Sequence, residues 1–116
     1  MPYDTRAADG IRVLLAEQPG VVERKMMGGI VFMVNGNMCV TASGRGGILV
    51  RVGPEAQKRV LKEPHVKAMT MAGRTMGGFV RVMPEGYRTA AALRKWVKRG
   101  LDYVSTLPAK AARRKR

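Results

Sequence analysis

The stretch KMMGGIVFMVNGNMCV, residues 25–40, decides the fold because it holds two glycine signals around one strand-like run. Asn35-Gly36 separates the apolar run 29–34 from a second run, 37–43. This dipeptide is a strong hairpin signal, since both central residues of a type I′ turn need a positive φ. Gly28-Gly29 stands before the first run, and we interpret it as a break or bulge ahead of a central strand.

Neither glycine-rich segment has the spacing of a phosphate-binding loop. A Walker loop requires G-x-x-x-x-G-K-[ST], and a dinucleotide loop requires G-x-G-x-x-G between a strand and a helix. Gly28-Gly29 leads into a strand, and SGRGG (43–47) lies between two strand-like runs. Neither segment therefore offers a helix N-terminus to a phosphate. Turn and bulge roles are predicted for both.

Short strands follow one another on both sides of the opening stretch. The sequence predicts strands at 21–27, 29–34, 37–43, 47–52 and 79–83. The segment 43–47 is expected to form a looser turn, which gives an antiparallel meander of three or four strands. Residues 65–78 have no clean hydrophobic period and several glycines, so they are predicted to be a loop.

Three helices are predicted around these strands. The first covers residues 5–18 and ends at Pro19-Gly20; the second covers 54–62, with Pro54 at its first position. The last helix begins after Thr89 and has one apolar stripe, consisting of Leu93, Trp96, Val97, Leu101, Val104 and Leu107. The predicted class is α+β, with an antiparallel sheet of about four to five strands, an N-terminal helix, a middle helix and a long C-terminal helix.

Length and composition indicate a single domain. The 116 residues fit one core, expected within residues 1–108, and residues 109–116 are expected to form a disordered basic tail. No apolar run approaches the roughly 18–20 residues of a membrane span, and the N-terminus lacks a signal-peptide pattern. Cys39 is the only cysteine, which excludes an intrachain disulfide. A cytoplasmic location without membrane contact is expected.

The chain is strongly basic. Its formal net charge is +14, and without the five cations of the tail 17 basic residues still face 8 acidic ones. Such a field attracts nucleic acid, an anionic membrane or acidic proteins without choosing among them, and it is also compatible with a functionally neutral basic surface. The candidate contacts are Arg94, Lys95, Lys98 and Arg99 on the last helix and Arg113, Arg114, Lys115 and Arg116 in the tail. Few aromatic residues are available for base stacking, so nucleic-acid binding would be mostly non-specific.

The residue inventory does not favour catalysis or metal binding. His65 is the only histidine and Cys39 the only thiol, so one chain cannot assemble a structural zinc site. No nucleophile–base pair or carboxylate pair is indicated, so we expect neither an enzyme nor a cofactor. The scattered methionines are interpreted as core or interface packing.

Two arginines occupy equivalent places in a short internal echo. LVRVGPE (49–55) and FVRVMPE (79–85) place Arg51 and Arg81 near the ends of two strands. By strand alternation each shares a face with a large apolar residue. We favour ion pairs with Glu55 or Glu85 over the alternative, a fork for a carboxylate or phosphate ligand.

The combination of these motifs resembles a known family. KMMGGIVFMVNGNM, ILVRVGPE and GGFVRV, followed by a Trp-bearing final helix, resemble the N-terminal domain of the TfoX/Sxy family over residues 3–107. The resemblance implies a curved antiparallel sheet with helices against it, similar to secretion-chaperone-like folds, and association as a homodimer. It also implies a non-enzymatic role. The best-known members are competence co-activators that work with a cyclic-AMP receptor protein, and full regulators carry a second domain.

The sequence therefore favours a regulatory module that acts by protein contact with the transcription machinery. The alternative is a weakly specific nucleic-acid-binding protein that uses the basic helix and tail.

Overall fold

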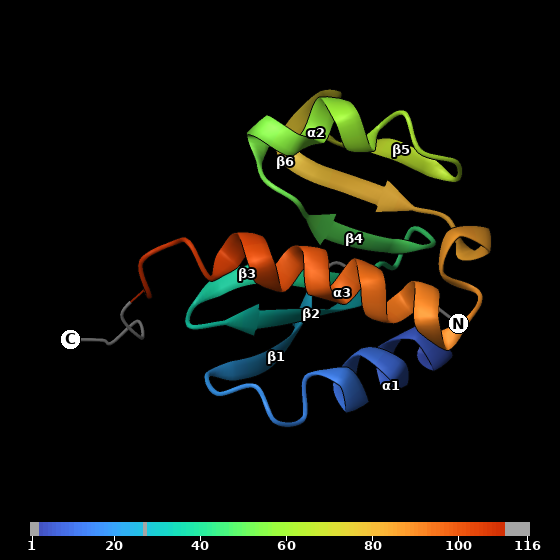
Figure 1. Cartoon of the computed structure of the whole chain (residues 1–116). Helices are drawn as coiled ribbons and strands as arrows, with labels where there is room; N and C mark the ends of the chain where they lie inside the picture. The colour runs from blue at the N-terminus through green and yellow to red at the C-terminus, as the bar shows by residue number, and fades with distance from the viewer. Residues whose placement is uncertain (1–2, 27, 111–116) are drawn as a thin grey trace.

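The predicted hairpin at Asn35-Gly36 forms, and both residues have positive φ, 51° and 82°. The computed structural model describes residues 3–26 and 28–110 (Figure 1). Its elements are α1 (Thr5–Leu14), β1 (Val21–Met26), β2 (Gly29–Val34), β3 (Asn37–Ala42), β4 (Ile48–Arg51), α2 (Pro54–Val60), β5 (Val66–Met71), β6 (Arg74–Val82), the 3₁₀ turn η1 (Pro84–Tyr87) and α3 (Ala90–Val104).

The strands form one open antiparallel sheet in the order β1-β2-β3-β4-β6-β5. The predicted α+β class, with an N-terminal, a middle and a long C-terminal helix, is confirmed. The sheet has six strands, and its two edges are β1 and β5.

The predicted loop at residues 65–78 is wrong, because this segment forms β5 and most of β6. Ala72 and Gly73 have positive φ and make the turn between the two strands. The pairing shifts register between Ala68 and Thr70, which breaks the regular alternation of apolar residues. Gly77 and Gly78 contribute no side chains to β6, so the alternation of apolar and polar residues that would predict a strand is not visible in this segment.

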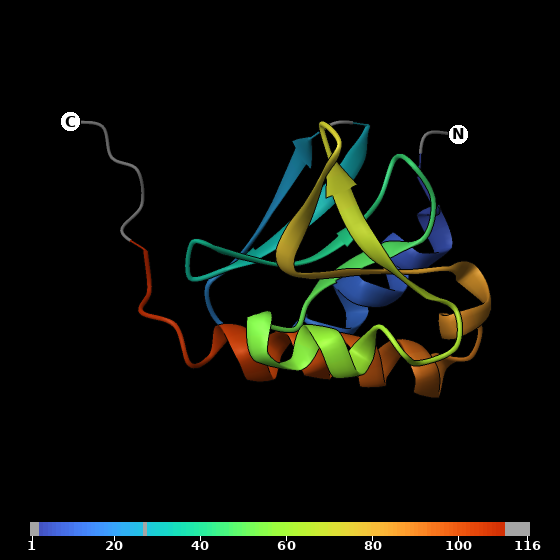
Figure 2. The same cartoon turned by 90° about the horizontal axis from the view of Figure 1, so that it is seen from above.

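The helices cover one face of the sheet, here called the helical face (Figures 1 and 2). Phe32, Ile48 and Val50 point toward them and are fully buried. Trp96 of α3 joins this core, and its indole N–H donates to the Gly86 carbonyl at 3.1 Å. A Cβ at Gly100 would lie 3.1 Å from Cys39 Sγ, so α3 approaches β3 closely because this position has no side chain.

The sheet is strongly curved. Figure 2 shows the outer strands on both sides bending away from the helices, so that the uncovered face is concave. This face carries the strand residues that alternate with the core, such as Val31 between Ile30 and Phe32. The molecule thus has a helical side and a hollow on the opposite side.

Candidate functional site

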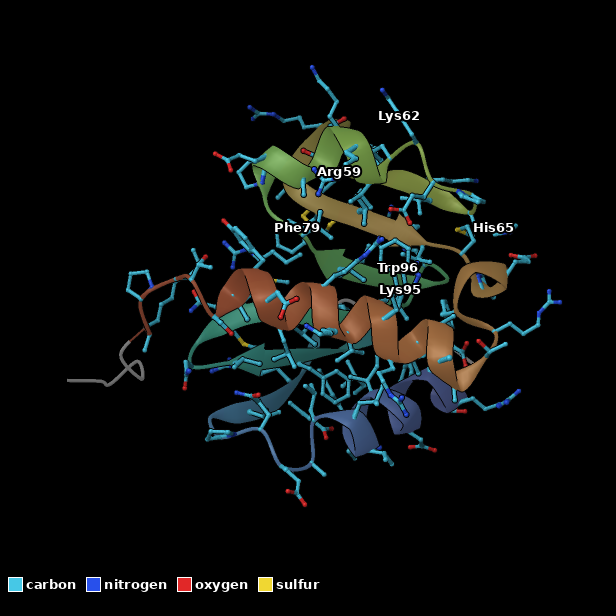
Figure 3. All side chains as sticks on the ribbon, viewed as in Figure 1. Arg59, Lys62, His65, Phe79, Lys95 and Trp96 are labelled. Carbon is cyan, nitrogen blue, oxygen red and sulfur yellow. The ribbon has the colours of Figure 1, made fainter. Side chains whose placement is uncertain are left out.

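Five exposed cations lie on α2, on the turn after it and on α3; we call this group the basic face. Arg59, Lys62 and Lys95 lie on the side of the molecule turned toward the viewer in Figure 3. Among the residues that the structure describes, no member has a carboxylate within 4.0 Å. The members are Lys58, Arg59, Lys62, Arg94 and Lys95.

The predicted helix cations divide into two kinds. Arg94 and Lys95 belong to the basic face, whereas Lys98 pairs with Asp102 at 3.1 Å within α3. Arg99 has a structural role: its guanidinium lies 4.4 Å from the Trp96 ring centroid. Arg99 also pairs with Glu63 at 3.0 Å, which ties α3 to the connection after α2.

A groove of about 300 Å³ lies between α2 and α3 beside the basic face, and Glu63 and Asp102 line it together with apolar and basic residues. Arg59 and Arg99 contribute its guanidinium groups, and the half-buried Tyr103 contributes an aromatic wall. Tyr103 also packs over Gly53, where a Cβ would lie 2.6 Å from the ring. The groove is therefore a shaped contact surface in which arginine and tyrosine stand together.

The predicted tail is only partly described. Lys110 donates its backbone N–H to the Asn35 carbonyl at 2.8 Å, and the Asn37 side chain donates to the Pro108 carbonyl at 3.1 Å. These contacts dock the chain after α3 against the β2–β3 turn. The predicted contacts Arg113, Arg114, Lys115 and Arg116 lie outside the described residues.

The concave face holds a cavity of about 440 Å³, here called the trough. Val31, Leu49 and Met69 form its buried floor. Methionines dominate its rim, and two of them, Met26 on β1 and Met71 on β5, come from the opposite edges of the sheet. The full lining is Met26, Val31, Met38, Thr41, Ser43, Gly44, Arg45, Leu49, Met69, Thr70, Met71, Met76, Phe79 and Arg81.

Arg81 is fixed at the β3–β4 turn, where it lines the trough. Its Nη1 donates to Ser43 Oγ and to the Gly46 carbonyl, both at 2.7 Å. Burial lowers the pKa of Arg81, and the positive charge of Arg45 lowers it further. Two guanidinium groups therefore share this wall of the trough.

Arg51 has a different environment. It lies between two aromatic rings, 5.4 Å from the Phe79 centroid and 5.7 Å from that of Tyr103. The ion pairs expected for Arg51 and Arg81 with Glu55 or Glu85 do not form in the described part of the chain. The structure instead gives Arg81 hydroxyl and carbonyl partners, and it gives Arg51 a long contact to the Met38 carbonyl and two aromatic rings.

Cys39 and His65 are not brought together. Cys39 is buried beneath α3, and burial raises the pKa of its thiol to about 12, so it stays protonated. His65 is exposed between α2 and β5. Within residues 3–26 and 28–110, no group of three or more histidine, cysteine or acidic side chains is placed to hold a metal ion. No helix in this described part is long and apolar enough to cross a membrane.

The trough is the feature that sequence reasoning missed. Its methionines were assigned to core or interface packing without a location, and Met69, Met71 and Met76 lie in the segment predicted to be a loop. The alternation of Met69 and Met71 was the available signal, since residues two apart on a strand share a face.

Comparison with known proteins identifies one family. The family model described as TfoX N-terminal domain matches residues 13–104, most of the chain. This match covers every strand, α2 and all of α3. Neither a curated protein nor a solved structure shows significant similarity to the chain.

Proposed function

The chain belongs to the TfoX N-terminal domain family, and from this premise we propose that it is a non-enzymatic interaction module. It acts in the cytoplasm by contacting a regulatory protein of the transcription machinery. The observation that carries this proposal is the basic face, with its exposed cations beside the α2–α3 groove.

The chemistry of this surface supports an acidic protein partner. Uncompensated cations steer a negatively charged partner toward the helical side and increase the association rate. Arginine and tyrosine are enriched at protein interfaces, where the aromatic ring and the planar guanidinium provide contact area with hydrogen bonds. Arg59 and Tyr103 supply both groups at one groove.

Homodimerisation is part of the proposal, and the β1 edge is the surface that favours it. Five of the six β1 residues are exposed, and a free edge strand presents unpaired backbone groups to a second strand. Val22→Glu would place a charged side chain on this edge at an exposed position, and charge on an edge strand opposes pairing with a second strand. We expect it to shift the dimer toward monomer in light scattering at high micromolar concentration; a wild-type monomer there would contradict dimerisation.

The protein-contact proposal is tested by capture from nuclease-treated native cytoplasm. We compare the wild type with the double variant Arg59→Glu/Lys95→Glu. A matched control, Lys67→Glu/Arg74→Glu, reverses two exposed cations outside the basic face. The wild type and the control should retain a transcription component that the basic-face variant loses. Absence of any such component from the wild-type eluate would contradict the proposal, as would equal retention by both variants.

The second candidate is non-specific nucleic-acid binding through the same face and the tail. The observation that favours it is the group of five cations without carboxylate partners in the described residues. If all five contact phosphates, they alone should give the logarithm of the affinity for duplex DNA a slope of about −4.5 against the logarithm of salt, and the tail cations should make the slope of the full chain steeper. Fluorescence anisotropy measures the slope, and removal of residues 111–116 should return it toward the value of the five cations. Undetectable or salt-insensitive binding would exclude this candidate.

A further inference from the structure

We propose that the trough is a binding site for a small amphipathic carboxylate. The apolar chain of the ligand lies among the methionines, and its carboxylate lies against Arg81. This site is on the face opposite α2 and α3, so it is independent of the proposed protein contact. Three properties of the trough carry the inference: its apolar lining, the distribution of charge on its strands and the fixed geometry of Arg81.

The lining suits an unbranched apolar chain. The volume of about 440 Å³ lies within the roughly 300–1,000 Å³ of small-molecule pockets. The floor at Val31, Leu49 and Met69 is buried, whereas Met26 and Met71 at the rim remain more than one-third exposed. Methionine is flexible and polarizable, so a methionine rim adapts to the outline of a ligand.

Charge on this face has one sign. A single row of paired residues crosses the sheet, with cations on the outer strands and apolar or hydroxyl residues between them. The row reads Arg24, Val31, Thr41, Leu49, Arg81 and Lys67. Within the strands that the structure describes, Glu23 is the only acidic residue. It bonds to Arg12 of α1 at 2.6 Å and thus belongs to the helical side. The trough face therefore offers positive charge without a strand carboxylate to balance it.

Arg81 is placed to bind the head group. Only its Nη1 bonds to acceptors among the described residues, Ser43 and Gly46, which hold the guanidinium in position. The Nε and Nη2 hydrogens remain for a ligand, and this edge of a guanidinium matches the two oxygens of a carboxylate. Burial and the nearby Arg45 both disfavour the charge of Arg81. A bound anion compensates both effects, because it supplies the missing opposite charge.

The first test is a titration with decanoate, kept below its micelle concentration, observed in the ¹³C-methyl spectrum of the methionines. Saturable shifts are expected for the lining methionines Met26, Met38, Met69, Met71 and Met76. Met33 and Met83 do not line the trough and serve as internal references. Absence of saturable shifts at the lining methyl groups would overturn the proposal. Methyl shifts that depend on the protein concentration and not on the decanoate concentration would also overturn the proposal, because they would indicate that a second copy of the chain covers the trough.

The second test separates the carboxylate contact from apolar binding. Arg81→Gln should weaken decanoate about ten- to a hundredfold, the usual effect of losing a charged hydrogen-bond partner, and leave decanol within about twofold. Arg74→Gln, an exposed arginine of the same strand outside the trough, should change neither affinity. Arg45→Gln in the exposed turn provides a second variant if Arg81→Gln does not fold. Shortening the chain from decanoate to octanoate should weaken binding by about fourfold per methylene.

Equal affinities of the wild type for decanoate and decanol would overturn the assignment of Arg81. Equal effects of Arg81→Gln and Arg74→Gln would do the same. Association with phosphatidylglycerol vesicles without saturable decanoate binding would identify a membrane surface as the ligand and contradict a small-molecule site.

Discussion

Gln57 of α2 holds the strand that forms one wall of the trough, so its removal tests how the β5–β6 hairpin is stabilised. Its Nε2 donates to the carbonyls of Met76 and Phe79 at 3.1 and 3.3 Å, and its Oε1 accepts from the Gly78 N–H at 3.0 Å. All three partners belong to β6, at the glycine-containing segment where the regular strand pattern is lost. Gln57→Ala leaves these backbone groups without their side-chain partner.

The expected loss follows from the number of hydrogen bonds. Each contributes about 0.5–1.5 kcal/mol net, and Gln57 is half-buried, so water replaces part of the contribution. We therefore expect Gln57→Ala to lower the free energy of unfolding by about 2 kcal/mol. Unfolding entropy of about 2.1 cal/mol/K per residue gives about 0.24 kcal/mol/K for 116 residues. The melting temperature should then fall by about 8 °C.

Thermal unfolding followed by circular dichroism measures this shift, and hydrogen exchange at the Gly78 amide locates it. Gln18→Ala is the matched control, because Gln18 is the other glutamine and its only side-chain hydrogen bond is 3.5 Å long, to Pro19. The control should change stability by less than about 0.5 kcal/mol. If Gln57→Ala melts within about 2 °C of this control, a threshold equivalent to about 0.5 kcal/mol, the network does not stabilise the hairpin and the reasoning is refuted.

Three further predictions concern the helical side. The Tyr87 hydroxyl donates to Asp4 at 2.9 Å, and burial, then this carboxylate, raise its pKa. The neutral Tyr87 phenol therefore stabilises the folded state fully below the ordinary tyrosine pKa of about 10, and this stabilisation is lost progressively as the pH rises above that value. Urea unfolding at increasing pH should show the loss in the wild type but not in Tyr87→Phe. The Cys39 thiol, with its raised pKa and its burial, should react with a disulfide reagent at pH 8 at least about a hundredfold more slowly than in denaturant; equal rates would contradict its buried position. Gly100→Ala should lower the urea midpoint, because the new Cβ crowds Cys39 and Val40 at 3.1–3.2 Å and overpacking costs about 1–3 kcal/mol; an unchanged or higher midpoint would contradict the close approach of α3.

The parts of the fold with strong local signals were predictable. Asn35-Gly36 predicted the hairpin, because this turn needs positive φ at both central positions and Asn and Gly adopt positive φ more readily than other residues. Thr89 gave the start of α3, and its hydroxyl accepts from the Ala92 N–H at 3.0 Å. The β5–β6 hairpin was missed because a register shift and Gly77-Gly78 remove the period-two pattern. The β5–β6 hairpin is stabilised by tertiary contacts, above all the hydrogen bonds of Gln57 to β6, and a local sequence pattern does not reveal these contacts.

The candidate sites follow the same division. Exposure of Arg94 and Lys95 could be predicted, since they lie off the apolar stripe of one helix. The pairing of Arg99 with Glu63 could not, because it joins residues 36 positions apart in the chain. The trough depends on the curvature of the whole sheet, which brings Met26 and Met71 from opposite edges to one cavity. No short stretch of sequence encodes that proximity.

The central claim is that the protein acts by protein contact through the basic face, and site-specific photo-crosslinking in the native cytoplasm tests it most directly. A photoreactive amino acid replaces Lys95 on α3 or, as the control, Arg74 on β6; both positions are exposed. We predict a discrete protein adduct at position 95 that survives nuclease treatment, is identified as a transcription component and is absent at position 74. Nuclease-sensitive adducts alone, or the same adducts at both positions, would contradict the claim.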